Sequence, residues 1–134
     1  MYQDLEGNAS EYGFLGHSSY HGTDKLTKPI QMNLMYFKSI DHVHKFTHSK
    51  SHRDGWDWWN ANVKDLDEIT IAHEVYNVPE GSWENIYQNA PIFDFAATRH
   101  EVMTEGGERK WGCPILDAKK GFKNSAGRMG TIKN

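Results

Sequence analysis

The chain has one cysteine, Cys113, among 134 residues, so an internal disulfide is excluded. A lone cysteine favours a reducing compartment, and we therefore expect the protein in the cytoplasm. The polar, acidic segment 1–10 has neither the basic nor the apolar part of a signal peptide, which agrees with that expectation. No stretch approaches the roughly 20 apolar residues of a membrane span, so no membrane partner is expected.

Sequence motifs for common cofactors and nucleophiles are also missing. There is no glycine-rich dinucleotide fingerprint after a strand, no P-loop and no G-x-S-x-G turn. Cys113 precedes Pro114 without an evident activating base, which argues against a thiol nucleophile. The formal net charge of −3 gives no basic surface for nucleic acid. We expect neither a bound cofactor nor a nucleic-acid partner.

Aromatic residues and histidines, in contrast, are plentiful. Aromatic residues make up 13% of the chain, with five tryptophans, and four of the eight histidines lie between positions 42 and 52. Large aromatic side chains supply apolar area and line ligand cavities well. For any single tryptophan, packing in a core is the simpler interpretation.

Alternating side chains predict two early strands, over Glu11–Tyr20 and Ile30–Lys38. Both faces of the second strand hold apolar residues, which suits a sheet with helices on one side and an enclosed cavity on the other. One face has Ile30, Met32, Leu34 and Tyr36, and the other has Gln31 and the expected substrate-binding residues Asn33, Met35 and Phe37.

A helix is predicted from about Ile40 to Val63, with Ser39 as its N-cap. Polar and glycine residues weaken its middle and favour two helical pieces joined by a bend. Further on, the patterns predict a strand over Ile69–Val78 that ends at a Pro79–Gly81 turn. Then come a helix over Trp83–Gln88, a strand over Phe93–Val102, a turn over Glu105–Glu108 and an irregular, wrapping tail over 111–134.

These elements predict an α+β fold in which a long helix covers an antiparallel sheet. Their order matches the second part of a ferredoxin-like unit, but no strand and helix precede Glu11. We therefore expect the missing cover to come from a partner subunit, in a homodimer. In this prediction residues 1–134 form a single domain with a flexible N-terminus at 1–10.

Three histidines, His44, His48 and His52, share one face of the predicted helix at intervals of four residues. At 1.5 Å per residue His44 and His52 lie about 12 Å apart along the axis, too far to bind one zinc ion together. Two adjacent histidines with ligands from elsewhere could still chelate a metal, but a solvated helix face is the favoured interpretation, and we expect no metal site.

The residues His52, Trp56, Trp59 and Asn60 form a second group on the same helix. They would either wall a pocket for a flat apolar substrate or pack the helix on the sheet. Packing is the favoured role for Trp59, whereas the two roles are balanced for His52 and Trp56.

A third group, His73, Glu74 and Tyr76, lies on a predicted strand. It is not the zinc-protease motif, which requires a helix and a second histidine where Asn77 stands. On a strand His73 points to one face, and Glu74 and Tyr76 point to the other. Buried, His73 or Glu74 would act as a general acid or base. The structural alternatives are a satisfied core histidine and a pair between Glu74 and an arginine.

In the segment 83–87, Trp83 and Tyr87 would close the end of a cavity, with Tyr87 donating to a substrate oxygen, or would form a lid that merely packs. Near the C-terminus, Arg128 would either clamp an acidic group or, given the glycines on both sides, belong to a mobile tail.

Three segments resemble one fungal protein family, namely His52–Asn60 (HRDGWDWWN), His73–Pro79 (HEVYNVP) and Trp83–Tyr87 (WENIY), with looser likeness in the tail at Pro114–Ala118 and Gly127–Gly130. The family is named for a monooxygenase of fumagillin-type terpenoid biosynthesis. It is similar to the antibiotic-biosynthesis monooxygenases, which are dimeric α/β barrels of the ferredoxin-like type. Family members have an extra N-terminal strand and helix that we do not find in this chain.

This resemblance implies a secondary-metabolite enzyme that oxidises a bulky apolar polyketide or terpenoid without a cofactor, because the protein helps to ionise the substrate and the carbanion reduces dioxygen. A cofactor-free cyclase or isomerase, a haem-binding protein with His52 as ligand and a non-catalytic carrier are the alternatives. The expected catalytic residues are His52, His73, Glu74 and Tyr87, and the expected substrate-binding residues are Asn33, Met35, Phe37, Trp56, Trp59, Asn60, Tyr76 and Trp83.

Overall fold

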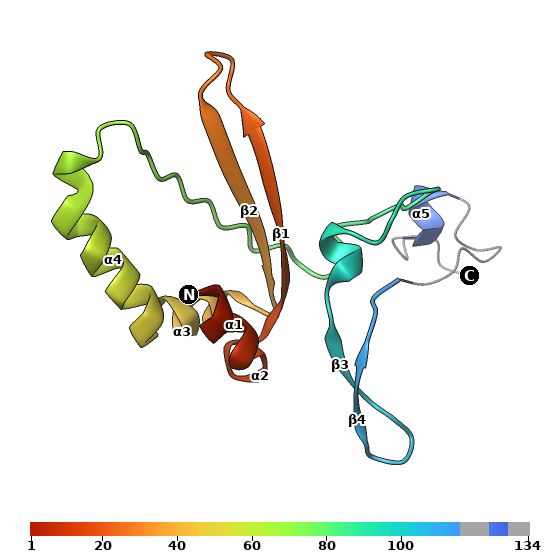
Figure 1. Ribbon diagram of the computed structural model, residues 1–134. Helices are drawn as coiled ribbons and strands as arrows, with labels where there is room; N and C mark the ends of the chain where they lie inside the picture. Colours follow the sequence, from red (N-terminus) through yellow and green to blue (C-terminus); the bar gives the residue numbers. More distant parts are fainter. Residues whose placement is uncertain (116–123, 129–134) are drawn as a thin grey trace. The chain divides into compact units, whose positions relative to one another are not determined.

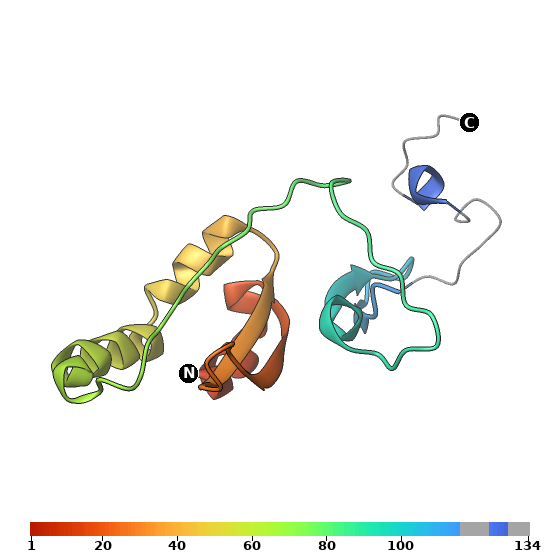
Figure 2. The ribbon, with the colours of Figure 1, turned by 90° about the horizontal axis from the view of Figure 1, so that it is seen from above.

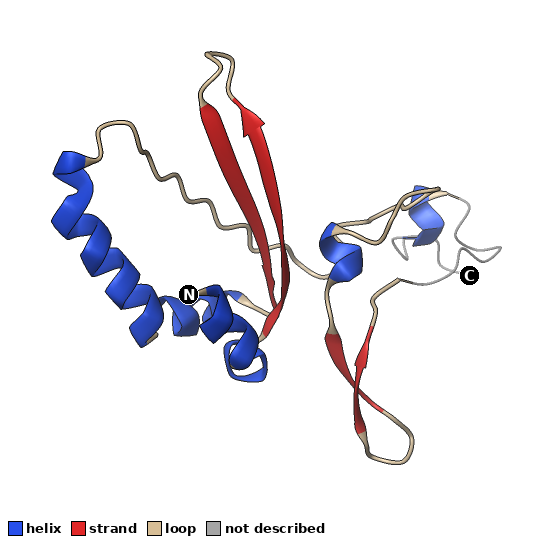
Figure 3. Ribbon diagram, in the orientation of Figure 1, coloured by secondary structure: helices blue, strands red, loops and turns tan. Residues whose placement is uncertain are grey.

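The computed structural model describes residues 1–115 and 124–128. Two compact units make up the chain: the first contains Met1–Leu15 and Phe37–Asn77, and the second contains Gly16–Tyr36 and Val78–Asn134. Helices and antiparallel strands occur together, so the predicted α+β class is confirmed (Figure 3). No helix within the described ranges is long and apolar enough to cross a bilayer.

Most elements are short. The helices among the described residues are α1 (Tyr2–Gly7), α2 (Ala9–Tyr12), α3 (Ile40–Thr47), α4 (Lys50–Asn62) and α5 (Ser125–Arg128), with 3-10 turns η1 (Val63–Asp65) and η2 (Asp94–Ala97). The strands are β1 (Phe14–Thr23), β2 (Pro29–Phe37), β3 (His100–Met103) and β4 (Arg109–Gly112). β1 pairs with β2 and β3 pairs with β4, so the part of the chain that the structure describes has two small sheets and no closed barrel (Figure 1).

The N-terminal segment is helical. α1 and α2 lie within residues 2–12, where the sequence predicts a flexible terminus and then the start of a strand. The strand prediction is wrong at Glu11, and β1 begins at Phe14. Gly13 ends α2 in the left-handed conformation, with φ of 55°, and a Cβ there would lie 2.3 Å from Cδ2 of His42. Both the backbone and the space therefore require glycine.

The β1–β2 hairpin confirms the predicted second strand to within one residue at each end. Asp24 holds its turn, because the carboxylate accepts hydrogen bonds from the backbone N–H groups of Leu26 at 2.7 Å and Lys28 at 2.8 Å. One face of β2 is open to solvent. Its apolar side chains are between 38% and 49% exposed, and they are Ile30, Met32 and Leu34.

The predicted long helix is confirmed as two pieces, α3 and α4, which Figure 2 shows as separate helices. Ser49 divides them because it has an extended backbone and caps α4, with its Oγ accepting from the backbone N–H of His52 at 3.3 Å. Ser39 stands at the N-cap of α3 as predicted, but its hydroxyl bonds Nδ1 of His42 at 2.8 Å instead of a backbone group. Gly55 does not interrupt α4.

The core of the first unit forms around Phe46, which is 4% exposed. Its ring contacts those of Tyr12, Phe37 and His52, with centroid separations of 5.6, 6.1 and 5.3 Å. Phe14 packs on Phe37 at 5.4 Å. Phe37, which the sequence predicts as a substrate contact, is thus part of this aromatic core.

Two elements predicted in the C-terminal half are wrong. Ile69–Val78 is extended but forms no strand, and within the described part of the chain no other strand pairs with it. A strand needs a partner for its backbone groups, and side-chain alternation alone does not supply one. Residues 83–88 are not helical, because so short a helix is unstable unless packing supports it. Trp83 instead packs on the ring of Phe95 at 4.5 Å.

η2 interrupts the predicted strand Phe93–Val102, so only its end forms β3. Asp94 has φ of 52°, and its carboxylate accepts a hydrogen bond from the hydroxyl of Tyr20. This hydrogen bond favours the protonated phenol and raises the pKa of Tyr20 to about 12. The ring of Tyr36 meets Phe95 edge to face at 5.8 Å. These contacts fix η2 on the hairpin within the second unit.

The predicted turn at Glu105–Glu108 is confirmed. It joins β3 to β4, with Thr104 N–H donating to the Glu108 carbonyl at 2.9 Å. The two strands are antiparallel, with Glu101 opposite Trp111. The sequence does not predict β4 or α5, and α5 interrupts the expected irregular tail. The rest of that tail, 116–123 and 129–134, lies outside the described residues.

Candidate functional site

A surface pocket of about 420 Å³ lies in the first unit. Its size falls within the range typical of small-molecule sites, about 300–1,000 Å³. Three of the predicted site residues, His52, Trp56 and His73, come together in its wall from two distant segments. The complete lining consists of Thr47, His48, His52, Arg53, Trp56 and His73.

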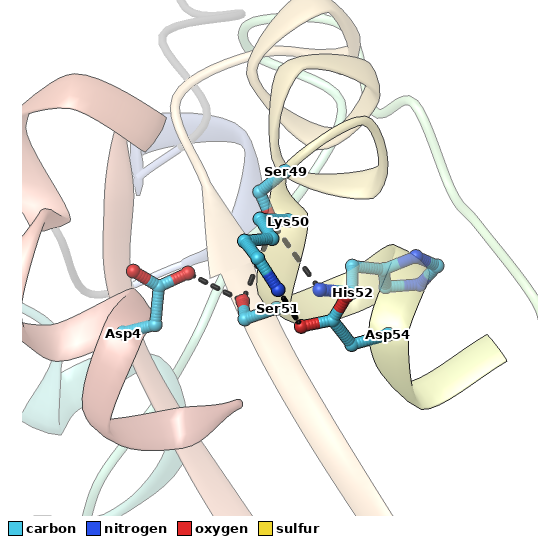
Figure 4. A network of polar contacts seen from close by, with 6 residues as sticks. All are labelled: Asp4, Ser49, Lys50, Ser51, His52 and Asp54. Carbon is cyan, nitrogen blue, oxygen red and sulfur yellow. Dashed lines mark hydrogen bonds and ion pairs between the residues drawn. The ribbon is translucent and has the colours of Figure 1, made fainter. Parts of the chain in front are cut away.

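The start of α4 is held by a network of polar contacts that also places His52 (Figure 4). Ser49 caps the helix, and the hydroxyl of Ser51 donates to the carboxylate of Asp4 in α1. Lys50 pairs with Asp54 one turn later at 2.5 Å. Because the helix end is tied to α1 and the His52 ring packs edge to face on Phe46, His52 is half-buried with a defined orientation.

His48 has a defined tautomer. Its Nδ1 lies 2.7 Å from the carbonyl oxygen of His44, and a carbonyl only accepts, so Nδ1 carries the hydrogen. In the neutral ring, Nε2 is therefore the proton acceptor. The described residues contain no group of three His, Cys, Asp or Glu side chains that would hold a metal ion.

Arg53 and Trp56 line the pocket from successive turns of α4. Trp56 is 55% exposed, so its indole is accessible to a ligand and is not core packing. Trp59 is half-buried and Asn60 exposed on the same helix, and neither is in the lining. Sequence reasoning missed Thr47, His48 and Arg53 as pocket residues. Helical spacing was the available signal, since His48 lies four residues before His52 and Arg53 lies three residues before Trp56.

The extended segment 69–78 carries His73 and a second polar pair. Tyr76 donates to Oε2 of Glu74 at 2.5 Å, and this hydrogen bond raises the pKa of the tyrosine. Glu74 thus meets Tyr76, as the shared face predicts, and not an arginine. All three side chains are exposed, so His73 is not a core histidine.

The other predicted residues lie in the second unit. The hydroxyl oxygen of Tyr87 accepts from the N–H of Ala96 at 3.2 Å, which leaves its proton available to another group. Asn33 accepts from the hydroxyl of Ser19 at 2.7 Å, and Met35 is half-buried. Trp83 is 47% exposed and packs against Phe95.

Arg128 clamps an acidic group, as expected, but that group belongs to this chain. Its Nε donates to Oε2 of Glu84 at 2.7 Å, and the hydroxyl of Ser125 donates to Oε1 at 2.8 Å. These bonds favour the carboxylate and lower the pKa of Glu84, with the Arg128 bond as the largest cause.

A pocket that combines imidazole, guanidinium and indole side chains is suited to a small-molecule enzyme, because it offers proton acceptors beside an apolar wall. Residues 1–95 match the model of the monooxygenase af470-like family, and the chain belongs to this family. The resemblance noted in the sequence is thereby confirmed.

One curated relative is Monooxygenase af470 of Aspergillus fumigatus, which is 26% identical over 135 residues covering 97% of this chain. The chain spans 47% of that relative's length, or about half of it. No solved structure matches the chain.

Proposed function

We propose that this chain forms the substrate pocket of a monooxygenase-like enzyme of secondary metabolism, which acts on a bulky apolar polyketide or terpenoid and needs no bound cofactor. The observation that supports this is a pocket lined by the imidazoles of His52 and His73 and by the exposed indole of Trp56. Membership of a monooxygenase family favours oxidation as the reaction.

In this proposal an imidazole, from His52 or His73, removes a proton from an activated C–H bond of the substrate. The carbanion passes its electrons to dioxygen, and a carbon–oxygen bond forms to give a peroxide. Loss of water from the peroxide leaves a carbonyl. One oxygen atom enters the product and the other leaves as water, so the substrate supplies all four electrons and no external reductant is needed.

Anthrone is a suitable probe, because its central CH₂ group is acidic and oxidation gives anthraquinone and water. We expect the protein to accelerate oxygen uptake and anthraquinone formation in equal amounts. His52→Gln or His73→Gln should lower kcat/KM by about 10²–10⁴-fold, the usual contribution of a general base. His44→Gln is the matched control, since His44 lies on α3 outside the pocket lining. If both pocket variants keep full turnover, the acid–base assignment is wrong.

A cofactor-free cyclase or isomerase would use the same imidazoles, since proton transfer alone requires no oxidant. Conversion of a substrate without oxygen uptake would favour that reaction over oxygenation. A Soret band in the purified protein would instead favour haem bound through His52.

The proposal also includes the barrel architecture and the oligomeric state. We propose a ferredoxin-like barrel completed by a second copy, since the open face of β2 offers Ile30, Met32 and Leu34 for burial. We also propose catalysis for Glu74 and substrate binding for Trp59, Asn60 and Tyr76, which belong to the same unit as the pocket. Phe37 packs in the aromatic core of that unit, so we propose no substrate contact for it. The roles expected for residues of the second unit stay predictions, namely catalysis for Tyr87 and substrate binding for Asn33, Met35 and Trp83.

A further inference from the structure

The ionisable side chains that line the candidate pocket are all basic. Among the described residues that form it, none is acidic, whereas one is an arginine and three are histidines. Arginine stays protonated in proteins, so the pocket has at least one permanent positive charge. The lining therefore complements a ligand of negative charge.

The charge of Arg53 is not neutralised locally. Within the described part of the chain its guanidinium has no hydrogen bond or ion pair. Asp54, the nearest acid in sequence, is paired with Lys50 at 2.5 Å. Asp57, one turn further along α4, makes no ion pair with it either. The five N–H donors of Arg53 are thus available to a ligand.

The position of Arg53 on α4 adds to this effect. It lies in the first turn of a helix of 13 residues, where the positive end of the helix dipole favours anions. Trp56 follows one turn later and is 55% exposed. The guanidinium of Arg53 and the apolar indole of Trp56 are thus neighbours on one helix surface.

We propose that the substrate of this pocket carries an acidic group, a carboxylate or an enolate, beside its apolar ring system. Arg53 anchors the acidic oxygens with two parallel N–H donors, a geometry that suits planar anions. Trp56 packs on the rings. This inference rests on the proposed function for the location of the site, and it adds Arg53 as the residue that selects the substrate class.

A pair of probes with one ring system tests the charge preference. 2-Naphthoate carries a carboxylate where 2-naphthalenemethanol carries a hydroxyl, and the binding of each is measured by calorimetry with the full chain. We expect the acid to bind about tenfold more tightly than the alcohol, the effect of a charge-assisted hydrogen bond in a partly exposed site. Equal affinity for the two probes, or binding of neither, would overturn the proposal.

Variants then assign the preference to Arg53. Arg53→Gln should bring the acid down to the affinity of the alcohol, and Arg53→Lys should restore part of the difference. Trp56→Ala should weaken both probes alike. Arg109→Gln, at an exposed arginine of β4, is the matched control and should leave the ratio unchanged. Circular dichroism of each variant confirms that the helices are retained.

These outcomes separate the substrate class from the reaction, because binding is measured without turnover. If Arg53→Gln leaves the acid–alcohol ratio intact, the anchor is wrong even when anthrone is oxidised normally. If the ratio collapses as expected but no oxygen is consumed with anthrone, the oxygenase assignment is wrong and the anionic site stands.

Discussion

At the scale of single residues, the Glu84–Arg128 pair makes the second unit sensitive to acid. Both side chains are partly buried, with exposed fractions of 29% and 24%, and the pKa of Glu84 is lowered by its hydrogen bonds. A carboxyl whose pKa is lowered in the folded state stabilises the protein above its unfolded pKa, near 4.3. That contribution is lost as the pH falls through the lower, folded pKa.

Glu84→Gln should therefore lower the urea midpoint of unfolding at pH 7, and the difference from the wild type should shrink as the pH falls from about 5 to 3. Tryptophan fluorescence reports the transition, since Trp83 adjoins the site. Glu80→Gln is the control, because Glu80 is exposed and has no partner among the described residues. A difference that stays constant down to pH 3 would contradict the role given to this ion pair.

The sequence predicts which types of residue line the pocket. It predicts only in part which individual residues come together there. His52 and Trp56 are four residues apart, so helical geometry alone places them on one face. His73 lies on another segment, and no spacing rule connects it to them. Arg53 is predictable by the same helical rule, because it lies three residues before Trp56 on the helix, although it is not among the residues predicted.

At the scale of elements, Gly13 is the position that is least able to accept another residue. It ends α2 with φ of 55°, and any Cβ would collide with the ring of His42. Gly13→Ala should destabilise the first unit by about 1–2 kcal/mol from the backbone alone, with the collision adding to this loss. The unfolding free energy from urea titration measures the effect.

Gly55→Ala is the matched substitution inside a helix. Gly55 has nothing within 4 Å of an added Cβ and lies inside α4. Alanine should therefore stabilise the helix by about 0.5–1 kcal/mol, the opposite sign from Gly13→Ala. If both variants shift the unfolding free energy in the same direction, the left-handed cap is not the reason why position 13 is glycine.

Local signals in the sequence suffice for some elements and fail for others. The break at Ser49 and the turn at 105–108 follow from capping and turn chemistry, which depend on a few neighbouring residues. The segments 69–78 and 83–88 are different, because a strand needs a partner and a short helix needs support. Contacts such as Trp83 on Phe95 involve residues distant in sequence, which no local pattern anticipates.

At the scale of the whole molecule, the described residues bury little apolar surface. The buried hydrophobic side chains among them are Leu5, Phe14, Leu15, Phe46 and Ala96. Many large apolar side chains are exposed instead, including those on the open face of β2. Exposed apolar surface of this kind marks an interaction site, which is the physical argument for a second copy.

We therefore expect sedimentation equilibrium to give twice the chain mass of 15.4 kDa. Replacing Met32 and Leu34 together by Lys should raise the dimer dissociation constant by about 100-fold or more, since each buried apolar side chain contributes about 1.5–3 kcal/mol. Gln31→Lys is the matched control, because residue 31 points to the opposite face of the strand. A wild-type chain that sediments as a compact monomer would rule out the homodimer, and equal weakening by the control would place the interface elsewhere.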